Sequence, residues 1–456
     1  MHRTTFVVGA GALCLALISG QAVAASTSHL PASRPLGQDL PVVDTSSEMV
    51  EEAVQTITGN LTLRQALAQA MLRNPELAAY SWSVRAKAAA SLQAGLLPNP
   101  ELEVGVENFG GNGEYVTSDN VETTVGLSQL LELGGKRSKR QAVASLEADL
   151  AGWDFEAKRL DVLTDTTKAF FAVLANQEQL VQVESLAKLA EEFLQTVNNR
   201  VEAGKVSPIE ASRAQVELLT AQIAQSRAQA DLEEARKELA TMWGDDLATF
   251  SHVVVEQEQV IPPPSLEKLL PLIEQNPDFA RLQTEEDKGG AQVALEKSKV
   301  FPDLTVGVGV RMFEETDDEA MVAGISLPLP LFDRNQGGIA EAKATLNQVK
   351  YQRQAAAIGL RKTLSNSYRN LSLAYNEFKT LKGKILPAAE QAFEAAGIGY
   401  RAGKFGFIET LDAQRTLFGV NTQYIEALAA YHQARTDVER LTGTSLDEIR
   451  AIETKP

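Results

Sequence analysis

The chain has 456 residues and a formal net charge of −17 at pH 7, with 60 acidic residues against 43 lysines and arginines. This excess of acidic residues argues against nucleic-acid binding, which depends on Lys and Arg. The one cysteine, Cys14, allows no disulfide framework and no cluster of thiolate metal ligands.

Residues 1–24 have the pattern of a secretory signal peptide. A charged start at Arg3 precedes an apolar run, and small residues follow up to Ala24, after which we expect cleavage. The run contains Cys14, but Leu13 stands where a lipoprotein signal has a small residue, so lipidation is not expected. The mature chain then has no cysteine and no thiol nucleophile. No later apolar run approaches about 18 residues, so the sequence predicts no membrane-spanning helix.

The rest of the chain is a unit of about 200 residues that occurs twice. Ala-Gly-Lys at 203–205 recurs at 402–404, and at the same offset Ile209 matches Ile408. The chain therefore divides into an extended N-terminal arm at 25–60, repeat 1 at 61–244, a linker at 245–264, repeat 2 at 265–443 and a C-terminal tail at 444–456. The arm is rich in Ser, Thr and Pro, and we expect it to pack poorly.

Each repeat begins with a predicted helix, at 61–97 and at 266–299. The apolar period then changes to two, which is typical of strands, at 101–108, 121–130, 304–312 and 321–329. Apolar residues on one face of these strands alternate with polar or small residues on the other. The apolar face consists of Leu102, Val104, Val106, Val125, Leu127, Leu304, Val306, Val308, Ile325 and Leu327.

A very long helix follows each strand pair. The first is predicted over 137–203, which at 1.5 Å per residue is on the order of 100 Å. The return helix, 208–243, is about half as long, and the opening helix 61–97 supplies the missing half when the two are stacked end to end. The second repeat has the same pattern, with helices over 338–402 and 407–442. Each repeat can therefore build two antiparallel rods of full length.

Four short strands cannot close a barrel by themselves, since the smallest membrane barrels use about eight strands. Open sheet edges are also not tolerated in lipid. If the strands enter a membrane, several chains must pool them. The alternative is a pair of ordinary soluble hairpins at the end of a helical rod.

Five segments resemble the outer membrane efflux proteins, the TolC-like channels, and they occur in the order of that family. They are "LTLRQALAQAMLRNPEL" (61–77), "PNPELEVGVEN" (98–108), "LSQLLELGGKR" (127–137), "SLPLPLFDRNQGGI" (326–339) and "YRAGKFGFIETLDAQ" (400–414). The third and fourth are most similar to the heavy-metal branch, the CzcC-like channels of tripartite RND pumps. Where the family form contains proline, this chain has Gln129-Leu130-Leu131, so we expect that strand end to differ locally.

The resemblance implies a mainly α fold with a small β part. Three copies would pool their strands in a 12-stranded outer membrane β-barrel, continued by a tube of 12 helical rods across the periplasm of a Gram-negative cell. The expected partners are a homotrimer, a periplasmic adaptor (membrane fusion protein), an inner-membrane RND transporter and outer membrane lipid. The implied function is the passive exit duct of an efflux pump, with heavy-metal cations as cargo. No cofactor is expected.

The resemblance also places the two Ala-Gly-Lys turns at the far, periplasmic end of the rods. Glu409 and Asp412 lie one helical turn apart on one face just beyond the second turn. These positions, and Glu210 in repeat 1, match the acidic residues that line the narrow end of such channels. Rings of carboxylates favour cations. The alternative is an ordinary solvated helix face.

Tyr400 and Arg401 resemble gate residues that hold neighbouring helices together at the closed end, although packing and solvation would explain them equally well. The turn tips are expected to contact the adaptor. They consist of Gly204, Lys205, Val206, Gly403, Lys404 and Phe405.

Catalysis is not expected, because the remaining histidines His29, His252 and His432 are far apart in sequence and no hydrolase or phosphate-binding motif is present. The sequence predicts no metal site either, so a metal cargo would pass through and not be held. Two alternatives stay open. One is a channel of the same fold for drugs or other organic solutes. The other is a periplasmic coiled-coil adaptor or scaffold.

Overall fold

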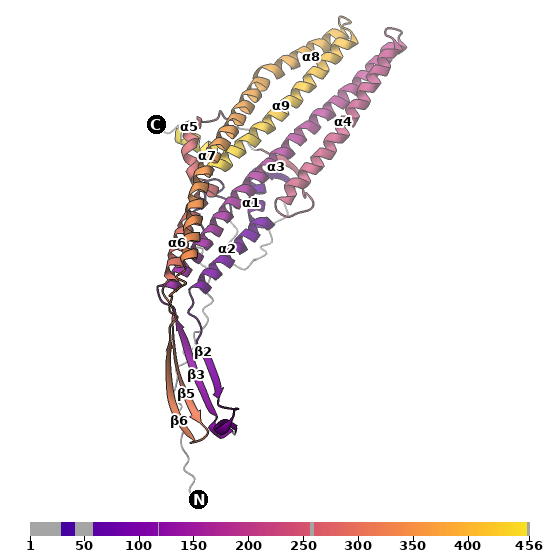
Figure 1. Ribbon diagram of the computed structural model, residues 1–456. Coiled ribbons are helices and arrows are strands. Elements are labelled where there is room, and N and C mark those ends of the chain that lie inside the picture. The colour runs from indigo at the N-terminus through magenta and orange to yellow at the C-terminus, as the bar shows by residue number, and fades with distance from the viewer. Residues whose placement is uncertain (1–28, 42–57, 117, 256–259, 454–456) are drawn as a thin grey trace.

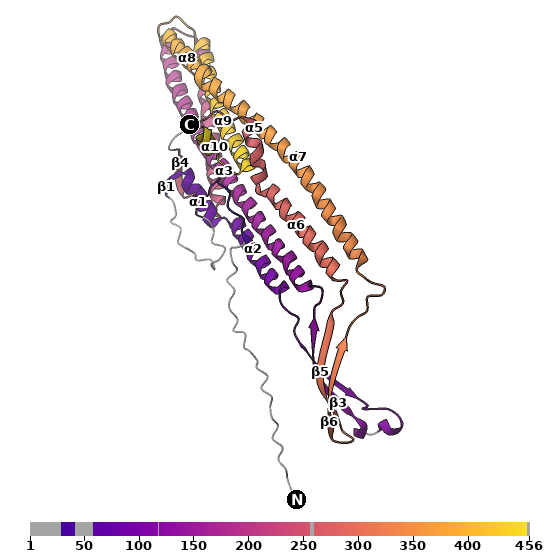
Figure 2. The same ribbon diagram turned by 90° about the vertical axis from the view of Figure 1, so that its left-hand side faces the viewer.

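The computed structural model describes residues 29–41, 58–116, 118–255 and 260–453. The predicted signal peptide and Cys14 lie outside these residues. Helices form an elongated body, a β-sheet projects from one end of it, and two helical hairpins form the other end (Figures 1 and 2). This arrangement agrees with the predicted mainly α fold.

Repeat 1 has the predicted order of opening helix, strand pair, long helix and return helix, preceded by a strand that was not predicted. The elements are β1 (Gly59–Thr62), α1 (Leu63–Arg73), α2 (Pro75–Ala94), β2 (Glu101–Glu107), β3 (Glu122–Leu131), α3 (Lys136–Glu202) and α4 (Pro208–Thr241). The α3 helix has 67 residues, as predicted. It contacts α1 and α2 along one half and α4 along the other, so the two stacked pieces form one rod beside it.

Repeat 2 has the same plan with more interruptions. Its elements are α5 (Leu266–Leu269), α6 (Pro277–Ser298), β5 (Leu304–Phe313), β6 (Asp318–Ser326), α7 (Gln336–Thr380), α8 (Leu386–Arg401), α9 (Phe407–Thr442) and α10 (Leu446–Glu453). The order in space is α3, α6, α7 near the sheet and α3, α9, α8 towards the hairpin tips.

The opening helix of each repeat is broken, where the sequence predicts one continuous helix. Asn74 ends α1 and caps α2, because its side-chain oxygen accepts a hydrogen bond from the Leu77 N–H at 2.9 Å. Its amide nitrogen donates to the Met242 carbonyl at 2.8 Å and so joins the break to the end of α4. Asn276 caps α6 in the same way, and its amide nitrogen donates to the Leu441 carbonyl near the end of α9 at 3.1 Å. Each break is followed by proline, which is favoured in the first helical turn and disfavoured later.

The predicted helix 338–402 is also not continuous. Residues Leu381–Ile385 form a π-helical segment between α7 and α8. Pro387 lies at the start of α8 and has no N–H to donate to the preceding turn. The extra residue of a π turn is a known response to such a lost hydrogen bond.

The four long strands form one antiparallel sheet in the order β2-β3-β5-β6, so β2 and β6 are its edges. The strand β3 continues to Leu131, which pairs with Leu304, because no proline interrupts it. The strand β6 ends at Ser326, earlier than the predicted end at 329. Pro328 accounts for the early end, since proline cannot donate to a strand ladder.

The predicted linker and tail contain secondary structure. Within the linker, β4 (Phe250–Val254) pairs in parallel with β1, and Phe250 is buried. Within the tail, Leu446 and Ile449 of α10 are buried against α7 and α9. Both regions complete the hydrophobic cores at the middle of the molecule, so 245–255 and the helix α10 are structural parts of the two repeats.

The described part of the N-terminal arm, residues 29–41, packs on α3 and corrects the prediction of a poorly packed arm. The Arg34 N–H donates to the Glu156 carboxylate at 2.7 Å, and Arg159 donates to the Leu36 carbonyl at 3.0 Å. Glu156 and Arg159 are themselves buried and paired at 2.7 Å. The backbone of this segment thus satisfies a buried ion pair, which no local sequence pattern could indicate.

Candidate functional site

Both hairpin tips are built by the same glycine turn. Gly204 and Gly403 have φ values of 67° and 70°, in the left-handed region that favours glycine. The Lys205 N–H returns to the Arg200 carbonyl at 2.9 Å, and the Lys404 N–H returns to the carbonyl of Gly399 at 2.8 Å. The structure therefore places the two Ala-Gly-Lys segments at equivalent ends of α3 and α8, where the repeat predicts them.

Side chains at the tips are mostly exposed. Lys205, Lys404 and Phe405 are exposed, and Val206 is half-buried. The Phe405 ring leans back onto Gly399, where a Cβ would overlap it, so glycine at 399 makes room for the ring. An exposed aromatic side chain at a helical tip is suited to contact with another protein.

Glu210 and Glu409 occupy the same position in their helices, the third residue after the N-cap. The N-caps are Ser207 of α4 and Gly406 of α9. A carboxylate in the first turn is favoured by the unpaired N–H groups and the helix dipole, which contributes about 0.3–1 kcal/mol. This local role is a second explanation for both glutamates. It does not apply to Asp412, which lies further along α9 and is exposed.

Tyr400 contacts the hairpin of repeat 1, formed by α3 and α4, whereas Arg401 is exposed. The Tyr400 ring is only 6% exposed and packs against Val197 of α3 and Ala214 of α4. A second link between the hairpins is the ion pair of Arg415 on α9 with Glu217 on α4. The tips of the two repeats are therefore in direct contact within one chain.

The strand register brings the predicted apolar residues to one face of the sheet. Leu102 pairs with Leu127, Leu127 with Val308, and Val306 with Ile325. This face is exposed along most of its length, and Leu327 follows beyond the end of β6. The opposite face is polar. Its charged residues are Glu101, Glu103, Glu107, Glu122, Arg311 and Asp318.

On the polar face, at the end of the sheet far from the helices, the positive charge of Arg311 offsets the negative charge of neighbouring glutamates. Its guanidinium lies 3.0 Å from the Glu122 carboxylate and 3.4 Å from that of Glu107, so it joins three strands. Glu101 and Glu103 lie nearer the helices and have no basic cross-strand neighbour, since they face Ser128 and Gly126.

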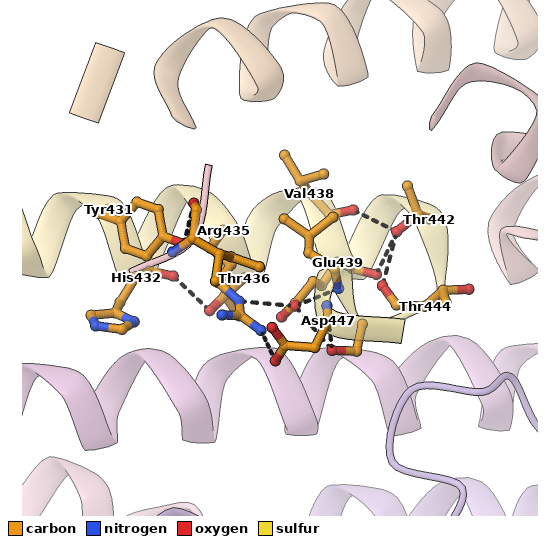
Figure 3. A network of polar contacts seen from close by, with 12 residues as sticks. Tyr431, His432, Arg435, Thr436, Val438, Glu439, Thr442, Thr444 and Asp447 are labelled. Carbon is orange, nitrogen blue, oxygen red and sulfur yellow. Dashed lines mark hydrogen bonds and ion pairs between the residues drawn. The ribbon is translucent and has the colours of Figure 1, made fainter. Parts of the chain in front are cut away.

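A buried polar network on α9, which sequence reasoning missed, lies at the middle of the molecule (Figure 3). Arg435 donates to Glu439 at 3.0 Å and to Asp447 of α10 at 2.6 Å. Burial would lower the pKa of Arg435, but the two carboxylates raise it above its ordinary value. Burial raises the pKa of Glu439, which Arg435 opposes. The network fixes α10 against α9, and this role is structural.

His432 belongs to the same region. Its ring stacks on Phe171 of α3 with centroids 3.7 Å apart, and burial, assisted by the nearby Arg435 charge, lowers its pKa to about 3. The Nε2 atom has no hydrogen-bond partner within the part of the chain that the structure describes. The neutral ring therefore acts as an aromatic spacer between α3 and α9.

No group of three or more His, Cys, Asp or Glu side chains is placed to hold a metal ion among the described residues. None of the helices in the described ranges is long and apolar enough to cross a bilayer.

Comparison with known proteins gives the sheet, the helices and the hairpin tips a context. The chain is 34% identical to the cobalt-zinc-cadmium resistance protein CzcC of Cupriavidus metallidurans, over 88% of this chain and 94% of that protein. It is 26% identical to the nickel-cobalt-cadmium resistance protein NccC of Alcaligenes xylosoxydans xylosoxydans, over 71% and 76% of the two chains. The crystal structure of the CmeC outer membrane channel of Campylobacter jejuni superimposes with a TM-score of 0.72 at 17% identity, over 86% and 89%.

The family model for outer membrane efflux proteins matches residues 66–245 and 271–444, which are the two repeats almost in full. Together with the relationship to CzcC, this match establishes that the chain belongs to the outer membrane efflux protein family.

Proposed function

We propose that three copies of this chain form the outer membrane exit duct of a tripartite efflux pump. The antiparallel sheet with two unpaired edges supports this assembly. If β6 of one copy lies beside β2 of the next, the antiparallel alternation continues, and three copies close a 12-stranded barrel with no free edge. The apolar face would then contact outer membrane lipid, and the rods would extend into the periplasm after cleavage of the signal peptide.

In this assembly the hairpin tips form the periplasmic entrance. Three copies each of Glu409, Asp412 and Glu210 would surround the narrowest part of the tube, and Tyr400 with Arg401 would control its width. The exposed tips, with Phe405, would receive the periplasmic adaptor, which in turn joins an inner-membrane RND transporter. The support is the position of these residues at one end of the rods, together with the resemblance to channels of this family.

We propose divalent metal cations as the cargo. The single observation that carries this choice is the 34% identity to a cobalt-zinc-cadmium resistance protein along 88% of the chain. The carboxylates of Glu210, Glu409 and Asp412 near the tips are compatible with this cargo, because rings of carboxylates favour cations in pores. The described residues form no closed cluster of metal ligands, which suits a duct that must release its cargo.

The test is deletion of the gene from the source bacterium and its complementation. Loss of the chain is expected to sensitise cells to Co²⁺, Zn²⁺ or Cd²⁺ and to raise the cellular content of these metals, with little change for organic drugs. Sensitisation to organic solutes alone would assign the channel to that cargo. Chemical crosslinking in detergent tests the assembly. Monomers or dimers without trimers would contradict the duct.

A further inference from the structure

Three of the four connections between sheet and helices are joined to one another by hydrogen bonds and ion pairs. Arg140 of α3 donates to the Ala94 carbonyl at the end of α2, at 2.9 Å, and pairs with Glu132 after β3. Asp303 before β5 accepts from the Leu133 N–H at 3.0 Å and pairs with Lys136 at 2.7 Å. These three connections therefore form one rigid block.

The fourth connection, residues 327–335 between β6 and α7, is different. Its anchor is Asn335, whose amide donates to the Glu296 carbonyl at 2.9 Å. Ahead of this anchor stands an exposed apolar stretch, in which Leu331 is 65% exposed and Phe332 is 91% exposed. Pro328 and Pro330 have no backbone N–H to donate, and the Leu331 N–H returns to the Leu329 carbonyl at 2.9 Å in a tight turn that leaves Leu331 and Phe332 exposed.

A second exposed apolar stretch lies at the opposite edge of the molecule. It is the connection from α2 to β2, in which Leu97 is 63% exposed and Leu96 is also exposed. Both stretches continue from the unpaired edge strands, β6 and β2. In Figure 2 the connection from β6 to α7 lies at the outer margin of the sheet end of the molecule.

The direction of the strands relates the two stretches. The chain runs towards the helices along β6 and away from them along β2, so a second copy that adds its β2 to β6 pairs in the antiparallel sense. The residues after β6 of one copy then lie beside the residues before β2 of the next. We propose that Leu329, Leu331 and Phe332 pack against Leu96 and Leu97 of the neighbouring copy and form an apolar collar at the base of the sheet. This inference rests on the proposed assembly.

A second copy fits these stretches better than lipid does. On the strands, apolar residues alternate with polar or small ones, as one lipid-facing side requires. The two stretches instead carry adjacent apolar residues, Leu331 with Phe332 and Leu96 with Leu97, at bends where the chain leaves the sheet. Each stretch continues from an edge strand, so a copy that pairs with that edge also reaches the stretch beside it. The collar would seal the seam between copies where the sheet gives way to separate helical rods, so that ions in the duct do not leak sideways.

The experiment uses paired cysteines in the full-length chain with Cys14→Ala, in outer membrane vesicles. Leu97→Cys is combined in turn with Leu329→Cys, Leu331→Cys or Phe332→Cys, and each pair is oxidised with copper phenanthroline. At least one pair is expected to give covalent dimers and trimers on a non-reducing gel. The control pair, Leu97→Cys with Phe109→Cys at the far end of the sheet, is expected to give none.

Native crosslinking through lysines is run in parallel, so that the proposal of the collar and the proposal of the trimer are tested independently. Trimers without any disulfide between the two stretches would contradict the collar but not the proposed duct. Quenching of Phe332→Trp emission by brominated phosphatidylcholine would assign the stretch to lipid instead and would also overturn it. As a second measurement, Phe332→Ser is expected to lower the temperature at which the trimer dissociates in detergent, and Phe109→Ser is expected to leave it unchanged. Equal effects of the two would contradict the collar.

Discussion

Tyr400 of α8 packs against Phe193 of α3, with the two ring centroids 5.2 Å apart, and this contact joins the tips of the two repeats. The Arg200 guanidinium lies 4.7 Å from the centre of the Tyr400 ring. The two hairpins belong to different repeats, so this contact lies where the proposed gate at Tyr400 would act.

We predict that Tyr400→Ala raises single-channel conductance and Tyr400→Phe does not. Truncating a buried aromatic side chain costs about 3–5 kcal/mol, so the contact between the two hairpins should weaken. The hydroxyl has no partner among the described residues, so its removal costs little. Recordings in planar bilayers measure the difference. The same conductance in the alanine and phenylalanine variants would show that Tyr400 packs the tip without controlling the opening.

The two faces of β5 give a second prediction. Val306 lies on the apolar face opposite Ile325, and Thr305 lies on the polar face opposite Ser326. Val306→Arg is expected to lose about 2–4 kcal/mol if it lies near the bilayer midplane, because a charge must enter hydrocarbon. Thr305→Arg should assemble normally. The yield of heat-resistant trimer in outer membranes measures both, and equal yields would contradict the assignment of the faces.

A third prediction concerns acid stability. The pKa of buried His432 is lowered to about 3, from an ordinary value of 6.5. The folded protein therefore binds fewer protons than the unfolded chain, so stability is retained above pH 6.5 and falls between pH 6.5 and 3, by up to about 1.4 kcal/mol per pH unit. His432→Phe keeps the stack on Phe171 and should reduce the loss of stability between pH 6.5 and 3. Urea unfolding at several pH values measures it, and an unchanged slope would exclude His432 as the cause.

A fourth prediction tests the docking of the N-terminal segment. A Cβ at Gly152 would overlap the carbonyl oxygen of His29, whereas no atom of the described ranges lies within 4 Å of a Cβ at Gly290, which is also within a helix. Replacing helical glycine by alanine normally gains about 1 kcal/mol. Gly290→Ala should therefore stabilise, and Gly152→Ala should destabilise and expose residues 29–41 to protease. Stabilisation by both changes would mean that the segment does not dock in solution.

Local patterns account for the parts of the fold that the sequence predicts correctly. The long α3 helix, the strand faces and the two glycine turns each depend on residues that are neighbours in the chain. The helix breaks also had a local signal, because asparagine before proline at 74 and 276 is typical of an N-cap. Similarly, Pro387 within the long second helix could have indicated the interruption at 381–385.

The remaining features depend on residues that are far apart in the sequence. Arg34 meets Glu156 across more than a hundred residues, and His432 meets Phe171 across a longer stretch still. Nothing near these positions distinguishes a buried charge from an exposed one. The pairing of β1, at the start of repeat 1, with β4, after its end, could not be predicted for the same reason.

The last prediction concerns Glu409 and Asp412, which follow the second glycine turn. If three copies converge at their tips, these carboxylates concentrate negative charge where the duct is narrowest and partly desolvated, and such a constriction focuses the field. Glu409→Gln with Asp412→Asn is then expected to lower cation selectivity and to weaken block by divalent or trivalent cations in single-channel recordings. Trimer yield should change little, because both side chains are exposed.

Two controls separate this role from simpler ones. Glu409 also lies in the first turn of α9, where its charge favours the helix start, so Asp412→Asn alone must reduce selectivity if the pore explanation holds. Glu101→Gln with Glu103→Gln removes the same charge from the polar face of the sheet. There the walls of a 12-stranded barrel would be farther apart, so the field on a passing ion should be weaker and the effect much smaller. Equal effects at the two ends, or no effect at the tips, would mean that Glu409 and Asp412 belong to an ordinary solvated helix face and do not line a pore.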